Sequence, residues 1–248
     1  MHEPLVLSLE EFGCGLLFLD EGAALPAWLK AHALPDDETT LQARFSAAAR
    51  TLIVRGLARV EDGKIVLDEL LGRMLRVAIH PRYSLSLVAM SEQEVQSCAY
   101  HVGDEHTVVC QAWKAEGGYA LAQVPFSHQH LGARAAEFFQ IKTAPATDET
   151  WEVSLEQFQD LPAATDLPEA VRQWLREDYA HERMRGSLSR VERAGDSLVS
   201  DYACLILRGP ERNWLFRLMP QEGRVRLRLA SSEALAEELA LLIERRYC

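Results

Sequence analysis

Two cysteines and two histidines lie close together in the sequence, at Cys98, His101, His106 and Cys110. Thiolate sulfur and imidazole nitrogen are ligands that zinc prefers, so this spacing suggests a zinc site. The surrounding residues predict two strands of a hairpin, in which successive side chains point to opposite faces. Cys98 and His101 are three positions apart, so no regular hairpin register gathers all four side chains, although a bulge would. We therefore expect no metal and no cofactor, and metal binding by these four residues stays an open question.

The other residues of chemically active types form no catalytic motif. His128 and His130 are two positions apart, and at the start of a helix their rings point apart, as expected of surface or capping residues. The sequence lacks the G-x-S-x-G elbow, the Walker A motif and the G-x-G-x-x-G fingerprint. A Ser-His-Asp triad is defined in space, so spacing alone does not test it. We expect a protein without catalytic residues, and an enzyme without a recognisable motif is the third hypothesis.

The composition is that of a folded protein. The chain has 248 residues, 48% hydrophobic and 25% charged, which excludes a disordered, collagen-like or coiled-coil protein. The 37 acidic and 26 basic residues give a net charge of −11, which repels nucleic acid and anionic membranes. Five irregularly spaced cysteines favour reduced thiols over a disulfide framework. No signal peptide is recognisable, and the apolar run 13–19 is too short to span a bilayer, so we expect a cytoplasmic protein without membrane contact.

Turn and capping signals divide the first 80 residues into short elements. Ser8 and Glu11 have the spacing of a capping box, and Gly56 fits the position that follows a helix. Asp62-Gly63 between two apolar runs predicts a tight hairpin, and Pro81 requires that the preceding helix end before it. The predicted order is strand 5–7, helix 9–18, a helix from Leu25, helix 36–55, hairpin 57–67 and a helix from Asp68.

Residues 39–80 therefore follow the order helix, hairpin, helix, which is typical of a winged-helix-like unit. The segment carries seven basic and four acidic residues, and its net charge of +3 is compatible with DNA. However, the tip Glu61-Asp62-Gly63 would lie near phosphate, which its charge repels, and the second helix offers few side chains that read bases. We expect a structural use of this unit, and a DNA-binding transcriptional regulator is the alternative function.

The spacing of apolar residues changes to a period of two after Pro81. This pattern predicts strands over 84–126, followed by a helix over 128–140, so we assign residues 1–142 to a first α+β half. A polar segment over 143–150 then predicts a linker. Residues 151–248 form the second α+β half, with the predicted elements helix after Pro168, strands 188–192, 198–208, 214–218 and 224–229, and helix 232–247.

The strand at 224–229 has one basic face, made by Arg224, Arg226 and Arg228. Alternation with valine and leucine predicts a half-buried strand. We interpret the basic face as a solvated surface paired with acidic residues of the chain. A docking surface for an acidic partner, or for a strand added at a sheet edge, is the alternative.

The two halves share a short similar segment. Residues 7–12 read Leu-Ser-Leu-Glu-Glu-Phe, and residues 153–158 read Val-Ser-Leu-Glu-Gln-Phe, at an offset of 146. In each half this segment is followed by helix, antiparallel strands and a closing amphipathic helix. The pattern predicts a pseudo-two-fold α+β arrangement, for which chance similarity between helix starts is the alternative.

Several of these motifs in this order resemble one family. They are Leu25-Pro26-Ala27-Trp28-Leu29, Arg55-Gly56-Leu57, the Asp62-Gly63 hairpin, His80-Pro81 at a helix end, and the strand 213–217, followed by one more strand and a closing helix. Over most of its length the chain resembles the EspG family of cytosolic chaperone-like proteins that serve type VII (ESX) secretion.

The resemblance implies a quasi-two-fold fold with a central antiparallel sheet flanked by helical bundles. It implies a non-enzymatic chaperone-like protein whose partner is a helical secretion substrate of the PE–PPE type, with its aggregation-prone tip held in the cytosol. The strands after Pro81 would lie near the binding surface, but no partner-binding residue can be carried over from the family. A nucleic-acid partner is not expected, and formation of a homodimer stays open.

Overall fold

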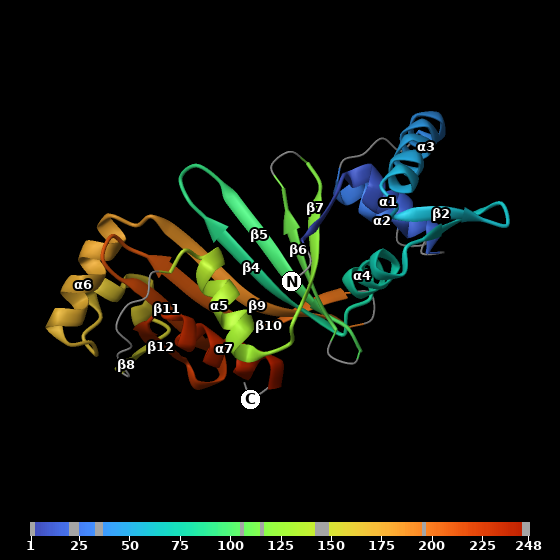
Figure 1. Ribbon diagram of the computed structural model, residues 1–248. Coiled ribbons are helices and arrows are strands. Elements are labelled where there is room, and N and C mark those ends of the chain that lie inside the picture. The colour runs from blue at the N-terminus through green and yellow to red at the C-terminus, as the bar shows by residue number, and fades with distance from the viewer. Residues whose placement is uncertain are drawn as a thin grey trace. The chain divides into compact units, whose positions relative to one another are not determined.

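The computed structural model describes residues 3–19, 25–32, 37–104, 107–114, 117–141, 149–194 and 197–244 (Figure 1). The chain forms two compact units, of which unit 1 comprises residues 1–82 and 100–124, and unit 2 comprises residues 83–99 and 125–248. This division differs from the halves 1–142 and 151–248 that we expected. The strand β4 (Tyr83–Met90) belongs to unit 2 because it pairs with β9 (Met184–Ala194) along most of its length.

Unit 1 has the elements that the N-terminal sequence predicts. The strand β1 pairs antiparallel with β7, and β7 with β6, while β2 and β3 form a separate hairpin. Its helices are α1 (Leu9–Phe18), α2 (Leu25–Ala31), α3 (Glu38–Val54) and α4 (Glu69–Ile79). Its strands are β1 (Leu5–Leu7), β2 (Ala58–Glu61), β3 (Lys64–Leu67), β6 (Val108–Trp113), β7 (Tyr119–Val124) and the last part of β5 (Val95–Val102).

Local capping explains where these helices begin. Asp37 caps α3, since its Oδ1 accepts the N–H of Thr40 at 2.8 Å. Asp68 caps α4 in the same way, and Gly56 follows α3 with a φ of 72° that favours glycine. The predicted helix-hairpin-helix order over 39–80 is confirmed, while its comparison with a winged helix stays a prediction.

Arg55 joins two motifs that lie far apart in the sequence. Its Nη1 donates to both carboxylate oxygens of Glu11 at 2.8 Å, and its Nη2 donates to the carbonyl oxygen of Val6 at 2.7 Å. Glu11 also completes the predicted capping box, because it accepts the N–H of Ser8 at 2.9 Å while Ser8 Oγ accepts the N–H of Glu11. The end of α3 is thereby held against β1 and the start of α1.

We expect Arg55→Ala to lower the free energy of unfolding by about 2 kcal/mol, because Glu11 is almost fully buried and would lose its charged partner. The measurement is equilibrium unfolding in urea. Arg50→Ala is the matched control, since within the described residues Arg50 donates only to the Ser46 carbonyl of its own helix. It should change stability by less than about 0.5 kcal/mol. Equal effects of the two substitutions would contradict the role given to Arg55.

Unit 2 contains a sheet in which the strand order is β5-β4-β9-β10-β11-β12-β8. Every pair from β4 to β8 in this order is antiparallel. The remaining strands are β8 (Thr150–Ser154), β10 (Ser197–Arg208), β11 (Asn213–Met219) and β12 (Arg224–Leu229). The helices are α5 (His128–Phe138), α6 (Glu169–Ala180), α7 (Ser232–Glu244) and the short 3-10 segments η2 (Gln157–Ala163) and η3 (Pro220–Glu222).

The strand orders of the two halves correspond to each other. The first half has the order β1-β7-β6-β5-β4, and the second has β8-β12-β11-β10-β9, so each strand has a counterpart in the other half. Ser154 repeats the bond made by Ser8, since its Oγ accepts the N–H of Gln157. The closing helices also begin alike, with Ser127 and Ser231 as caps, each accepting an N–H three residues ahead. These correspondences support the pseudo-two-fold arrangement that the repeat predicts.

The second copy of the repeat differs locally from the first. Strand β1 leads into the α-helix α1, whereas β8 leads into the 3-10 segment η2, which has Pro162 inside it and a non-helical Asp160. Proline removes a backbone donor and clashes with a continuing α-helix. The shared six residues therefore encode the strand and the serine cap rather than a helix of equal length.

The two closing helices α5 and α7 pack directly against each other (Figure 1). Gly132 lies at their crossing, where an added Cβ would come within 2.6 Å of the Cβ of Ala236. The end of α7 is held by Arg190 of β9, which is 5% exposed and donates to the carbonyl oxygens of Leu242 and Ile243 at 2.7 and 2.9 Å. Among the described residues, no helix is long and apolar enough to cross a membrane.

Candidate partner-binding groove

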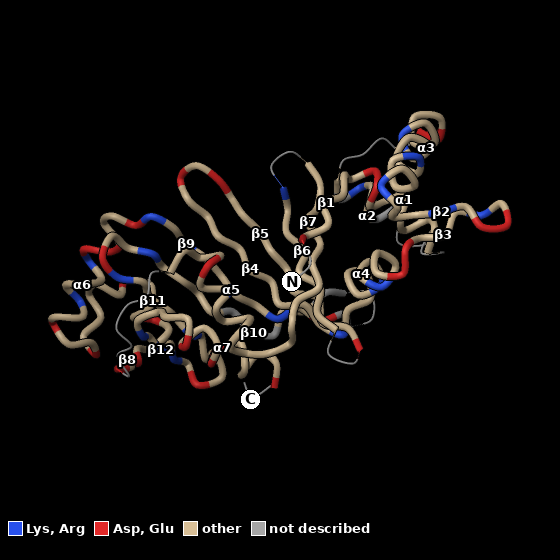
Figure 2. Tube along the Cα trace, in the orientation of Figure 1, with Lys and Arg blue, Asp and Glu red and all other residues tan. Residues whose placement is uncertain are grey.

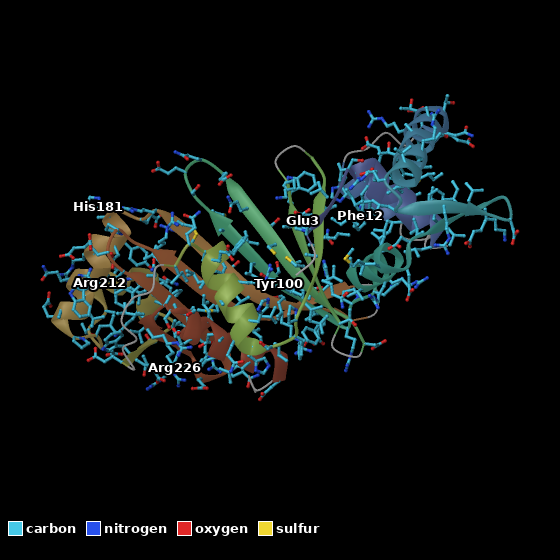
Figure 3. The ribbon with its side chains drawn as sticks, viewed as in Figure 1. Glu3, Phe12, Tyr100, His181, Arg212 and Arg226 are labelled. Atoms are coloured by element: carbon cyan, nitrogen blue, oxygen red, sulfur yellow. The ribbon has the colours of Figure 1, made fainter. Side chains whose placement is uncertain are left out.

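The basic face of β12 is paired with acidic residues of unit 2. Arg226, labelled in Figure 3, and Arg224 both donate to Glu152 of β8, at 2.8 and 3.0 Å. Arg228 donates to Glu238 of α7 at 3.0 Å. Because β8 pairs with β12, β12 is not an edge strand. The expected pairing with acids is therefore confirmed. The alternative of a strand added at the edge of β12 is wrong, and that of a docking surface for an acidic partner stays a prediction.

The structure does not test whether Cys98, His101, His106 and Cys110 together bind zinc. Cys98 and Cys110 are buried, and His106 lies outside the described residues. Within the part of the chain that the structure describes, no three His, Cys, Asp or Glu side chains are grouped so that they could hold a metal ion. His101 is hydrogen-bonded through Nε2 to Oε1 of Gln111 on β6, at 3.1 Å. Because an amide oxygen only accepts, Nε2 of His101 carries the proton.

We expect the stability of the protein to fall as the pH drops from about 6.5 towards 4. Burial lowers the pKa of His101 from 6.5 to about 4, so the folded chain keeps this imidazole neutral while the unfolded chain takes up a proton. The stabilisation that comes from the neutral His101 is complete above the pKa of the unfolded chain and is lost below it. The free energy of unfolding should fall by about 2 kcal/mol between pH 7 and about pH 4.5. Urea unfolding at both pH values measures it, and His101→Gln should remove that part of the decrease.

His181→Gln is the control for this measurement, because His181 is exposed (Figure 3). On acidification, His181→Gln should lose as much free energy of unfolding as the wild-type chain does. If His101→Gln and the wild-type chain lose the same stability on acidification, the assignment to His101 is wrong.

The histidines at the start of α5 have structural contacts. The N–H of His130 donates to Ser127 Oγ at 3.1 Å, and His130 Nε2 accepts from Nε of Arg134 at 3.2 Å. His128 packs edge-on against Phe126, with 6.3 Å between ring centroids. The two residues therefore lie at the helix cap, as the sequence predicts.

A groove of about 380 Å³ lies in unit 2 between the turn of the β4–β5 hairpin, the end of α5 and the first residues of β9. Apolar side chains contribute part of its lining, and the remainder is polar or charged. The apolar lining residues are Ala89, Phe138 and Met184, and the others include Glu92, Glu94, Gln140, Glu182, Arg183 and Arg208.

The β4–β5 hairpin exposes apolar side chains on both of its arms. Met90 at the end of β4 is 50% exposed and Val95 at the start of β5 is 66% exposed. Ser91 orders the turn between them, because its Oγ accepts the N–H groups of Gln93 and Glu94 at 3.3 and 3.2 Å. An ordered turn with exposed apolar side chains on its arms is suited to binding another protein.

Acidic residues gather at the tip of this hairpin, as Figure 2 shows. Basic side chains, Arg183 and Arg208, line the same groove. Gln140, directly after α5, accepts a hydrogen bond from Nη1 of Arg208. Its φ of 51° lies in the left-handed region, which is uncommon for a residue other than glycine. The groove therefore combines three apolar side chains, two cations, three carboxylates and a residue in an unusual backbone conformation.

Sequence reasoning named no residue of this groove. It placed the region after Pro81 near the binding surface, but Met90 and Val95 are ordinary strand residues by type. The recognisable signal is the polar run Ser91-Glu92-Gln93-Glu94 between two apolar residues, which is typical of a hairpin turn in solvent. The contributions of Phe138 and Arg208 require the tertiary structure, since these residues lie 43 and 113 positions after Val95 in the sequence.

Comparisons with known proteins bear on the fold. No protein-family model matches the sequence, and no curated protein matches it. The structure is similar to that of the Mycobacterium tuberculosis type VII secretion system chaperone EspG5, solved in complex with the PE25–PPE41 dimer, with a TM-score of 0.70 and 8% sequence identity. The similarity covers 97% of this chain and 96% of that chain. The chain therefore has the α+β fold of an EspG-like chaperone, as the sequence resemblance predicts.

Proposed function

We propose that the chain is a non-enzymatic, cytoplasmic, chaperone-like protein that binds a helical secretion substrate of the PE–PPE type. The observation that carries this proposal is the similarity of fold over nearly the whole chain to a chaperone solved with such a dimer. Because the two sequences are only 8% identical, the partner of this chain is expected to be a different protein of the same class.

The groove supports this proposal through its physical character. A chaperone must cover apolar surface on its partner, and it needs accessible apolar surface of its own to do so. Met90 and Val95 supply accessible apolar surface on the hairpin whose turn lines the groove, and Phe138 and Met184 are apolar residues of the groove lining. The hairpin that carries Met90 and Val95 lies directly after the helix that ends before Pro81, where the family resemblance places the binding surface.

The experiment is affinity purification of the tagged chain from its native host, followed by mass spectrometry. We expect one helical secretion substrate of the PE–PPE type to be retained in near-stoichiometric amount. The double variant Met90→Asp/Val95→Asp should reduce the retained partner at least about tenfold, because two exposed apolar contacts become charged.

Val60→Asp is the matched control, since Val60 is an exposed valine on β2 and lies outside the groove. It should retain the partner as the wild-type chain does. Recovery of DNA would favour the regulator hypothesis, and recovery of neither a PE–PPE-type protein nor DNA from a host that produces such substrates would overturn the proposal.

A further inference from the structure

Two arginines of the groove differ from most arginines of unit 2. Nine arginines of this unit have a carboxylate oxygen within 4.0 Å, namely Arg172, Arg176, Arg185, Arg190, Arg212, Arg217, Arg224, Arg226 and Arg228. Among the described residues, Arg183 and Arg208 have none at that distance. The chain has a net charge of −11, so acidic side chains are abundant and the absence of a carboxylate at these two positions is notable.

The two arginines are neighbours in the sheet. The N–H of Arg183 donates to the carbonyl oxygen of Arg208 at 2.8 Å, where the first residues of β9 meet the end of β10. Burial and the adjacent Arg183 guanidinium both lower the pKa of Arg208. Two cations held side by side repel each other, so an anion placed between them would remove an unfavourable interaction.

Arg208 also has donor capacity that the described residues do not use. Its Nη1 donates to Gln140, while its Nε is buried and has no acceptor within the described chain. Of the three carboxylates that line the groove, Glu182 accepts from Arg185, Glu94 accepts from Gln96, and Glu92 is exposed at the hairpin turn. Guanidinium groups bind carboxylates through charge-assisted hydrogen bonds, so Arg208 and Arg183 are suited to a carboxylate partner.

We propose that Arg183 and Arg208 together bind the carboxylate of an aspartate or glutamate on the helical partner. This inference rests on the proposed function and adds to it a chemical requirement on the partner, namely an acidic residue next to apolar ones at its tip. The apolar neighbours would pack on Phe138 and Met184, which line the same groove. Removal of the carboxylate from water by these apolar groups strengthens its attraction to the two cations.

The experiment measures the dissociation constant of the purified chain for the PE–PPE-type partner that it retains, by calorimetry at low and high salt. We expect Arg208→Gln and Arg183→Gln each to weaken binding about tenfold or more, and to reduce its salt dependence. The double variant should be only slightly weaker than either single variant, because both arginines bind one group. Arg208→Glu should be rescued by Lys at the acidic position of the partner.

Arg224→Gln is the matched control, because Arg224 is exposed, pairs with Glu152 and lies outside the groove. It should bind as the wild-type chain does. The melting temperature of free Arg183→Gln should equal or exceed that of the wild type, since Arg183 is exposed and its loss removes repulsion from Arg208. This variant tests the inference even if Arg208→Gln fails to fold.

The outcomes separate this inference from the proposed function. If the wild-type chain binds the partner and both glutamine variants bind equally well, the arginine site is wrong and the proposed function stands. If the wild-type chain binds no PE–PPE-type partner, both are overturned. If the variants weaken binding by the same factor at low and at high salt, recognition of a carboxylate is also contradicted.

Discussion

Gly132→Ala is expected to lower the free energy of unfolding by about 2–3 kcal/mol, although alanine is the better helix former. A Cβ at this position would come within 2.6 Å of the Cβ of Ala236, 2.7 Å of its Cα and 2.8 Å of its N. Backbone atoms cannot yield as a flexible side chain can, so α5 and α7 would have to separate. Urea unfolding measures the effect, and at this chain length it corresponds to a decrease in Tm of roughly 4–12 °C.

Gly72→Ala provides a control of opposite sign. Gly72 lies inside α4, where an added Cβ would meet Leu19 Cδ2 at 3.7 Å and Leu67 Cβ at 3.9 Å, which are ordinary contacts. This substitution should therefore stabilise the protein by up to about 1 kcal/mol, through helix propensity. Stabilisation by Gly132→Ala as well would mean that α5 and α7 do not pack as closely as described.

Asp178→Ala is expected to lower the free energy of unfolding by about 3 kcal/mol. Asp178 of α6 is fully buried, and its Oδ2 accepts the indole N–H of Trp214 on β11 at 2.8 Å. Arg212, labelled in Figure 3, lies 3.6 Å from the same oxygen. The substitution would leave a buried donor without an acceptor and remove one carboxylate from Arg212. Equilibrium unfolding in urea measures the change.

The matched control for Asp178 is its neighbour Glu177. Glu177 is exposed and lies 3.5 Å from Arg212, so Glu177→Ala should cost less than about 0.5 kcal/mol. Trp214→Phe removes the indole donor, and the double variant Asp178→Ala/Trp214→Phe should be less destabilised than the sum of the single variants. Additive effects would mean that the Asp178–Trp214 bond does not hold α6 to the sheet.

The sequence predicts most elements of the fold because their ends depend on nearby residues. The capping box of Ser8 and Glu11 places the start of α1, and Asp68 places the start of α4. Asp62 and Gly63 both adopt positive φ, as the predicted hairpin requires. Each of these signals acts within four residues, so periodicity and capping suffice to find them.

Contacts between segments that are distant in the sequence cannot be predicted from such local signals. The capping box and the end of α3 are each recognisable, but the bond between Glu11 and Arg55 crosses 44 residues of sequence. The strand predicted over 188–192 extends in the structure to Met184–Ala194, because pairing with β4 and β10 holds residues whose own types do not favour a strand. Pairing with β9 likewise assigns β4 to unit 2.

The groove was missed for the same reason. Its residues come from the β4–β5 turn, the end of α5, and the adjoining ends of β9 and β10, and no local pattern connects these segments. Arg183 and Arg208 look like ordinary strand-end cations in the sequence. Their importance emerges only from their mutual contact and from the carboxylate partners that most neighbouring arginines have.

Hydrogen–deuterium exchange of the chain with and without its PE–PPE-type partner tests the central claim most directly. If the groove of unit 2 is the binding surface, the partner should slow exchange over residues 89–96, 138–140 and 182–184, which form most of the groove. Exchange over the exposed β2–β3 hairpin of unit 1 should stay unchanged. Protection confined to that hairpin and α4, with the groove exchanging as in the free chain, would contradict the account.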